Sequence, residues 1–382
     1  MTESISQSVF MGYPRANGNA GTRNYLGVVI VGNCAATAAR QVARAFTAKR
    51  LAAYANVDGV VPFVHELGCG MEKSGEPMDL LRRTLGGSIR NPNLAGALVL
   101  ALGCERNNIY GFLEQERLAH GPMLKSVVLQ EVGGTAAAIE QGVIAIESML
   151  DEANRSKRVP VSLEHLVIGL QADDESRDER VHRAMGLAVD KLVAAGGTAI
   201  ATDTRGSARS LMTRTDTPAL RELLEQRIEW WGEHTAGRDT RAARQREIAG
   251  SAHIGSSSLQ AVFGYAHPAP RRGLVFMDSP RHEAVCSSGL VAAGANLVSI
   301  ASRDTSTFGA TAAPTVKLAL DAEHDAQFNG DLDIHADDGS IERHGDLILS
   351  RWIAHASGDP TRSEELGVGE AEFAPWHIGV LA

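Results

Sequence analysis

The chain has 382 residues, of which 44% are hydrophobic and 22% are charged, and this composition excludes a disordered or membrane-embedded protein. Its length exceeds one ordinary core and predicts two domains, at about 150 residues per domain. The formal net charge of −9 argues against nucleic acid as a partner, because binding to phosphates requires clustered Lys and Arg. Local basic pockets for a small carboxylate are compatible with that charge.

The sequence predicts no membrane partner and a cytoplasmic location. Its longest apolar stretch, residues 94–102, is far below the roughly 20 residues that span a bilayer. Residues 1–10 lack the charged start and the apolar run of a signal peptide. Four cysteines are too few for a disulfide scaffold, so each is either a buried apolar residue or a reactive ligand.

The first half alternates short β-branched runs with helical stretches, which is typical of a parallel sheet built from βαβ units. Strands are predicted at residues 26–31, 59–64, 97–102 and 126–130. Helices are predicted at residues 35–49, 77–85 and 109–119. The polar segment 151–158, followed by Pro160, predicts a linker between a domain of residues 1–158 and a domain of residues 159–382.

The second half repeats this alternation. Strands are predicted at residues 166–170, 198–202, 274–278 and 297–301, and helices at 179–195 and 219–231. Residues 238–258 are charged and then rich in Ser and Gly, which predicts a surface loop. The expected fold class is therefore α/β, with two Rossmann-like domains that each contain a parallel sheet.

Three cysteines follow one another at equal intervals of 35 residues: Cys34, Cys69 and Cys104. Each comes just after a predicted strand and has a glycine nearby that lets backbones approach closely. Because the carboxyl ends of parallel strands form one crevice, we expect the three thiols to meet there. Cys34 would also begin a helix, where the pKa of a thiol is lowered and the metal-binding thiolate is favoured.

Two interpretations of these cysteines remain open. Three thiolates can hold an iron–sulfur cluster with one iron left open, or one or two of them can join His65 around a single iron(II) or another divalent metal. Alternatively they are small buried residues, since free Cys is among the most buried types. Cys286 has no comparable neighbours and is predicted to be buried.

Other motifs indicate less. The segment Gly133, Gly134 and Thr135 follows a strand, so it either binds an anion through its backbone N–H groups or simply forms a turn. The acidic run 173–175 is typical of a solvated face. Lys73 lacks the preceding glycine of a phosphate-binding loop, and no G-x-G-x-x-G follows the first strand, which argues against a kinase or a nucleotide-dependent dehydrogenase.

Short motifs along nearly the whole chain resemble those of the altronate and galactarate dehydratase family, which also includes the large subunit of sulfolactate sulfo-lyase. They lie at residues 12–18, 21–24, 65–70, 91–93, 103–105, 133–135, 194–198, 277–280, 293–295, 308–309 and 314–317. The resemblance implies elimination of water, or of sulfite, from a hydroxy acid, with iron or a related divalent metal as cofactor.

The sequence departs from the family pattern in three places. Residues 171–176 read Gln-Ala-Asp-Asp-Glu-Ser where the family usually shows Lys-Cys-Gly-Gly-Ser-Asp. Two further family segments are replaced around residues 251–260. A small N-terminal domain of the SAF type, carried by many members, is not found, so we expect either a separate small SAF subunit or a variant that works alone.

The resemblance and the residues together favour a metal- or cluster-dependent hydro-lyase that forms a homo-oligomer. The expected metal ligands are Cys34, His65, Cys69 and Cys104, the catalytic residues are His65, Arg23 and Glu105, and the substrate-binding residues are Asn24, Gly133, Gly134 and Thr135. His65 would act as base or ligand, and Arg23 would clamp the substrate carboxylate or else form a structural ion pair. The alternatives are elimination of another leaving group and a degenerate protein that binds a ligand or partner without catalysis.

Overall fold

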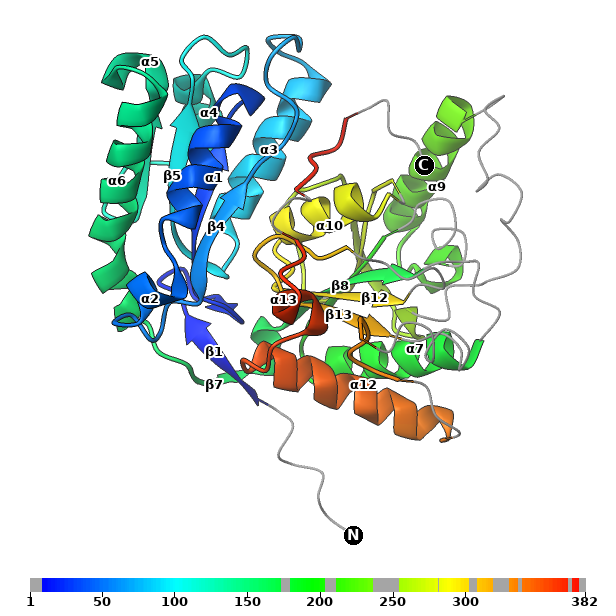
Figure 1. Ribbon diagram of the computed structural model, residues 1–382. Coiled ribbons are helices and arrows are strands. Elements are labelled where there is room, and N and C mark those ends of the chain that lie inside the picture. Colours follow the sequence, from blue (N-terminus) through cyan, green and yellow to red (C-terminus); the bar gives the residue numbers. More distant parts are fainter. Residues whose placement is uncertain are drawn as a thin grey trace.

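The computed structural model describes residues 9–172, 179–202, 211–235, 254–280, 282–301, 308–318, 330–335, 339–369 and 373–377. Its main layers are two parallel sheets, one in each half of the chain, with helices on their faces (Figure 1). The predicted α/β fold class is confirmed.

The first sheet contains four parallel strands in the order β4-β3-β5-β6. The strands are β3 (Tyr25–Ile30), β4 (Gly59–Phe63), β5 (Leu94–Ala101) and β6 (Leu124–Val128). The helices are α1 (Ala36–Arg44), α2 (Ala48–Leu51), α3 (Glu76–Arg90), α4 (Ile109–Gln115), α5 (Leu129–Val132) and α6 (Thr135–Arg155). Because successive strand residues face opposite sides, Val28 and Ile30 pack with α1 and α6, whereas Val29 packs with α3 and α4.

Two sequence predictions in this half are corrected. The predicted linker 151–158 is wrong over its first residues, because α6 continues to Arg155. Met149 and Ala153 are buried in the core, and this packing holds the helix beyond the point where its surface becomes polar. The predicted helix 35–49 divides into α1 and α2, because the Thr47 side chain accepts a hydrogen bond from Arg50 N and starts a new helix.

The second sheet contains six parallel strands in the order β10-β11-β9-β8-β12-β13. The strands are β8 (Val167–Ala172), β9 (Thr198–Ala201), β10 (Leu259–Phe263), β11 (Gly273–Met277), β12 (Leu297–Ala301) and β13 (Thr315–Leu318). The helices are α7 (Glu179–Ala194), α9 (Pro218–Thr235), α10 (Glu283–Ala292), α12 (Ile341–Ala356) and α13 (Arg362–Glu365). Helices α7 and α12 share one core with the sheet, and α10 packs into the core on the other face.

A small antiparallel sheet joins the beginning of the chain to its middle. It has the order β2-β1-β7, with β1 (Val9–Pro14), β2 (Ala20–Gly21) and β7 (Val159–Ser162). The proposed domain boundary at residue 158 lies immediately before β7. Only residues 254–258 of the predicted loop 238–258 lie within the described residues. In that described part, no helix combines the length and the apolar character needed to cross a membrane.

The two halves are tied together through α3 and α10, which lie side by side in Figure 1. A side chain at Gly87 of α3 would place its Cβ 2.4 Å from the Ala292 carbonyl oxygen, so the helices approach closely. Asn91 donates from Nδ2 to the carbonyls of Val291 and Ala295, both at 2.8 Å. The motif at 91–93 is therefore part of the junction between the halves.

Candidate functional site

Three adjacent strands of the first sheet place cysteines at its carboxyl edge. Cys34 lies in a 3-10 turn (Asn33–Ala35) after β3, while Cys69 and Cys104 lie in the loops after β4 and β5. The sulfur atoms of Cys34 and Cys69 are 3.3 Å apart, and Cys104 is close enough for its charge to act on the Cys69 thiol. All three side chains are exposed. We call these three residues the thiol rim.

Glycines allow the three loops of the thiol rim to interlock, as the sequence predicts. Gly68 has a φ of +108°, and a Cβ at this position would lie 2.5 Å from the Gly32 Cα. A Cβ on Gly32 would in turn lie 2.6 Å from the Glu105 Cγ. The rim thus depends on two positions that have no room for a side chain.

The thiol rim is unfavourable to negative charge when no cation is bound. The hydrogen bond with Cys34 raises the pKa of Cys69 to about 11, with further contributions from partial burial and from the charges of Cys34, Glu105 and Cys104. A soft metal ion would relieve this repulsion, since thiolates are its preferred ligands. Among the described residues, however, no three His, Cys, Asp or Glu side chains form a metal-ligand cluster. The thiols are suitable donors for a soft metal, but their present positions do not form a complete ligand set: Cys34 and Cys69 are in contact, and Cys104 lies near them.

His65 lies below the thiol rim with both ring nitrogens occupied. Its Nε2 is 3.0 Å from the Ile30 carbonyl oxygen, and its Nδ1 accepts a hydrogen bond from Leu67 N at 3.1 Å. These partners assign the proton to Nε2. Burial lowers the pKa of His65 to about 4. In this conformation the ring orients the loop after β4 and has no free nitrogen, so the geometry does not support the predicted role as base or metal ligand.

Glu105 is the candidate catalytic residue that keeps free hydrogen-bonding capacity. Its carboxylate accepts from Leu102 N and, at 2.6 Å, from Gly103 N, so it closes its own loop beside Cys104. A carboxylate has about four lone-pair sites. Each oxygen therefore keeps a lone pair that accepts from no other group in the described part of the chain, with 7% of the residue exposed.

Arg23 is a structural residue, and the prediction that it clamps a substrate carboxylate is not supported. It forms a two-pronged ion pair with Glu364, in which Nε–Oε1 and Nη2–Oε2 are both 2.7 Å. Its other donors go to the carbonyls of Thr22, His355 and Asp359. A guanidinium has five N–H donors, and all five are used. Arg23 therefore ties the first sheet to α13. This contact corresponds to the alternative prediction, in which Arg23 forms a structural ion pair.

Asn24 is likewise fully engaged in the interior. Its Nδ2 donates to the carbonyls of Asn56 and Ala153, and its Oδ1 accepts from Arg15. The geometry therefore does not support the predicted role of Asn24 in substrate binding.

The segment Gly133 to Thr135 forms a turn between α5 and α6. The N–H groups of Gly133 and Gly134 both donate to the Leu129 carbonyl, and both glycines have positive φ, +98° and +106°. These two amides are thus occupied, which favours the turn over the anion site. Thr135 is exposed at the first position of α6.

Sequence reasoning missed two residues next to the thiol rim. Asn107 is fully buried and donates from Nδ2 to the Val31 carbonyl at 2.9 Å, which fixes the Cys104 loop against the Cys34 loop. Arg106 is exposed directly after Glu105. The signal for both was their position immediately after the Cys104 motif.

Two remaining predictions concern residues away from the thiol rim. Cys286 is buried in α10, as predicted, and its thiol donates to Thr202 Oγ1 at 3.3 Å. The acidic residues 173–175 lie outside the described residues.

Comparisons with known proteins agree with the motifs. The family model described as D-galactarate dehydratase/altronate hydrolase, second domain, matches residues 12–154. The model described as D-galactarate/altronate dehydratase, C-terminal, matches residues 247–381. Together these matches take in the thiol rim and most of the second sheet.

Curated relatives show the same likeness over most of the chain. An altronate dehydratase of Bacillus subtilis is 26% identical over 93% of this chain and 75% of its own length. An altronate dehydratase of Escherichia coli is 26% identical over 81% of this chain and 66% of its own length. The galactarate dehydratase (L-threo-forming) of Escherichia coli is 25% identical over 86% of this chain and 68% of its own length. The chain belongs to the D-galactarate/altronate dehydratase family.

Proposed function

We propose that the chain is a hydro-lyase that removes water from a small sugar acid or related hydroxy acid, with the thiol rim at its reaction site. The relatives that cover most of the chain are named dehydratases of altronate and galactarate. The observation that carries the proposal is the contact between Cys34 and Cys69 beside Cys104, because these exposed thiols converge at the carboxyl edge of a parallel sheet, where ligands bind in such folds.

Glu105 is the proposed base that removes the proton next to the substrate carboxylate. It is mostly buried, it is held by two backbone N–H groups, and it keeps lone pairs free at the thiol rim. Arg106, exposed beside it, is the proposed anchor for the substrate carboxylate in place of Arg23. His65 acts here as a positioning residue, because its hydrogen bonds set the loop that carries Cys69.

The proposed cofactor is iron, as iron(II) or as an iron–sulfur cluster, with another divalent metal as the alternative. Cys34, Cys69 and Cys104 would hold it. Bound there, the metal would act as a Lewis acid that polarises the leaving hydroxyl and the carboxylate.

The direct test is to purify the full chain without oxygen and to measure its iron and sulfide, followed by water elimination from a panel of hydroxy acids. We expect bound iron that is lost in Cys69→Ala and kept in the matched control Cys286→Ala, whose thiol is buried in the second half. Glu105→Gln should lower turnover about 10²- to 10⁴-fold. Iron content and turnover that are unchanged in Cys69→Ala would contradict the proposal.

Substrate preference is proposed to differ from that of the named relatives. Ala172 stands where the family has a thiol, and Asp173 and Asp174 stand where it has two glycines. Together with Glu175, these two carboxylates would repel a sugar-acid carboxylate bound nearby. We therefore expect altronate and galactarate to be poorer substrates than other hydroxy acids in the panel. Efficient altronate dehydration would contradict this part.

A non-catalytic binding protein is the second candidate, and the occupied ring nitrogens of His65 favour it. Absence of both metal and turnover in protein reconstituted with iron would support this candidate. Release of sulfite from sulfolactate would instead indicate the sulfo-lyase chemistry.

The assembly remains a proposal. A separate small SAF-type subunit, a homo-oligomer and a cytoplasmic location are expected from the resemblance and the composition. Co-purification from the native host and the mass of the native complex test the first two.

A further inference from the structure

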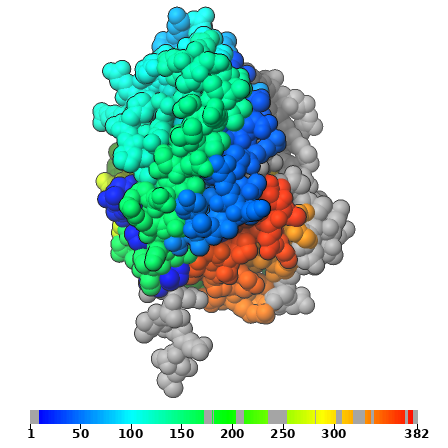
Figure 2. Space-filling model, turned by 60° about the vertical axis from the view of Figure 1, so that its left-hand side comes forward, coloured from blue at the N-terminus to red at the C-terminus, as the bar shows by residue number. Residues whose placement is uncertain are grey.

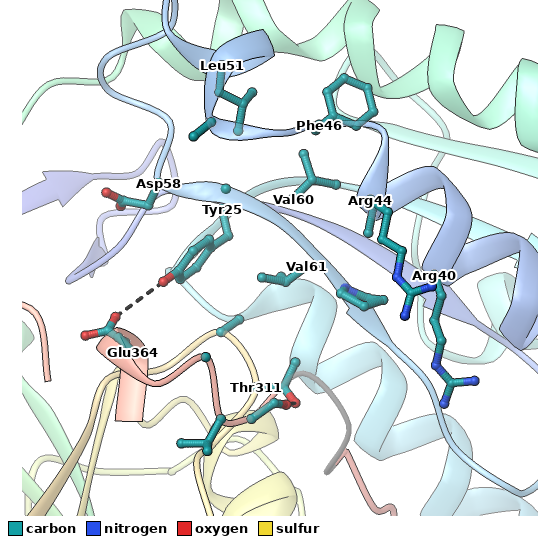
Figure 3. A pocket seen from close by; sticks show the side chains of 18 of the residues that line it. Tyr25, Arg40, Arg44, Phe46, Leu51, Asp58, Val60, Val61, Thr311 and Glu364 are labelled. Carbon is teal, nitrogen blue, oxygen red and sulfur yellow. Dashed lines mark hydrogen bonds between the residues drawn. The ribbon is translucent and has the colours of Figure 1, made fainter. Parts of the chain in front are cut away.

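A cleft of about 550 Å³ lies between the two halves of the chain, away from the thiol rim. Helix α1 and strand β4 form one wall, and residues 310–313 and 367–369 form the other (Figure 3). Figure 2 shows the C-terminal segment, in red, lying against the first half, in blue. The volume is in the range of small-molecule sites, which lie preferentially at domain interfaces. None of the residues assigned to the reaction site lines the cleft.

One end of the cleft carries two uncompensated positive charges. Arg40 and Arg44 are four residues apart on α1, so their side chains lie on one face of the helix. Figure 3 shows both guanidinium groups at the same end of the cleft. Within the described ranges, neither of them makes a hydrogen bond or an ion pair with another side chain, whereas Arg50 on the neighbouring helix is paired with Glu147. Two adjacent charges without a counter-ion favour an anionic ligand.

The opposite end of the cleft carries acidic groups whose charges are offset. Glu364 accepts a hydrogen bond from the Tyr25 hydroxyl at 3.3 Å and is neutralised by Arg23. Asp58 accepts from Asn24 N and lies 4.0 Å from Arg158. These negative charges are therefore compensated, whereas the two arginines have no counter-ion in the described part of the chain, so its charges polarise the cleft along its length.

The walls between these ends offer hydrogen bonds, and a hydrogen bond from the first half of the chain positions one of them. Strand β4 is the outermost strand of its sheet, and its free edge presents backbone groups that no neighbouring strand uses, except for the N–H that Pro62 lacks. Ala312 has a φ of +60°, which a residue with a side chain rarely adopts. Its carbonyl accepts from Asn93 Nδ2 at 2.9 Å, and this bond holds the wall in place.

We propose that this cleft is a second binding site, for a small hydroxycarboxylate, separate from the thiol rim. The carboxylate binds Arg40 and Arg44, and the hydroxyl groups bind the edge of β4 and the side chain of Thr311. Arg40 and Arg44 lie four and eight residues beyond the first residue of α1, or roughly 6 and 12 Å of helical rise from it. Since no residue of the proposed reaction site lines the cleft, binding in the cleft and turnover at the thiol rim can be lost separately.

The test is isothermal titration calorimetry of the full chain in the Cys69→Ala background, with galactarate as the probe. We expect one molecule bound per chain. Each guanidinium contributes about tenfold to the affinity, so Arg40→Gln/Arg44→Gln should weaken binding roughly a hundredfold. The matched control is Arg155→Gln/Arg351→Gln, which also removes two positive charges, but from exposed positions on other helices. It should bind galactarate as the parent does.

Two further ligands define the chemical class. Galactitol has the same carbon chain without carboxylates and should bind at least about tenfold more weakly, because it loses the charged hydrogen bonds. Sulfate, an anion without hydroxyl groups, should compete only at much higher concentration. The proposal is overturned by absence of galactarate binding, by unchanged affinity in Arg40→Gln/Arg44→Gln, by equal affinity for galactitol, or by equally strong competition from sulfate. Urea midpoints of all variants show that the comparison is made between folded proteins.

Discussion

Two parts of the first half carry polar motifs that resemble those of the family: the thiol rim, and the contacts of Arg23 with the second half, which we call the Arg23 junction. They differ in burial and in whether their polar groups have partners. At the junction, Arg23 is 3% exposed and each of its donors has a partner. At the rim, the thiols are exposed, and the Cys69 thiol is held in its neutral form by its neighbours. A satisfied polar cluster stabilises the fold, whereas an unsatisfied and exposed one is open to a ligand. Arg23 is therefore structural, and the thiols of the rim are the candidates for binding a ligand, a distinction that the motifs alone do not make.

The largest expected effect comes from breaking the junction. Arg23→Ala leaves the mostly buried Glu364 carboxylate and several carbonyls without partners, and we expect a loss of about 3–5 kcal/mol in the free energy of unfolding. Urea denaturation measures it. The control Arg50→Ala breaks an exposed ion pair with Glu147 and should cost less than about 1 kcal/mol. Equal losses in the two variants would mean that the junction is not a special contact.

The next effect concerns the interlocked loops of the rim. Gly68→Ala places a Cβ 2.5 Å from the Gly32 Cα in a backbone conformation that side chains disfavour, and should destabilise the chain by about 2–4 kcal/mol. Gly70→Ala is the matched control, because Gly70 also has positive φ, +74°, but has open space around it. It should cost only about 1–2 kcal/mol. Chemical denaturation of both variants measures the loss in the free energy of unfolding. A larger loss in Gly70→Ala than in Gly68→Ala would refute the steric argument.

A third prediction concerns pH and the buried ring below the rim. The pKa of His65 is about 4 in the folded chain against an ordinary 6.5, so between these values the unfolded chain binds a proton that the folded chain does not. The free energy of unfolding is therefore unaffected by the titration of His65 above pH 6.5. Below this value it falls by about 1.4 kcal/mol per pH unit until the pH reaches the pKa of the folded chain. Urea unfolding at pH 7, 6 and 5 should show this slope in the wild type and a shallower one in His65→Gln. His120→Gln, which changes an exposed ring, should retain the slope; a wild-type slope in His65→Gln would show that other groups cause it.

The smallest expected effect is on thiol reactivity. Because the hydrogen bond with Cys34 is the main cause of the raised pKa of Cys69, Cys34→Ala should increase the thiolate fraction at Cys69. The gain in thiolate is partly offset by lower nucleophilicity, so alkylation by iodoacetamide at pH 8 should be roughly tenfold faster. Mass spectrometry of the labelled peptide measures the rate, with Cys286→Ala as the control. An unchanged rate would show that the 3.3 Å contact does not govern Cys69.

The alternation of apolar runs and helical stretches was enough to predict the parallel sheets, because strand period and helix period are local properties of the chain. The equal spacing of the cysteines also predicted a shared edge, since each βαβ unit returns the chain to the same side of the sheet. Strands β10 and β13 were missed. Each forms one edge of the second sheet and contains a polar residue, Gln260 or Lys317, that interrupts its apolar run.

The sequence by itself determined which residues stand at the strand ends, but only the tertiary structure decided which of them are free to act. Arg23 meets Glu364 from the other end of the chain, and His65 meets the carbonyl of Ile30 across a neighbouring strand. Such partners depend on long-range packing, which no local pattern records. The cleft with Arg40 and Arg44 is also a product of packing, because its second wall comes from residues more than 200 positions away.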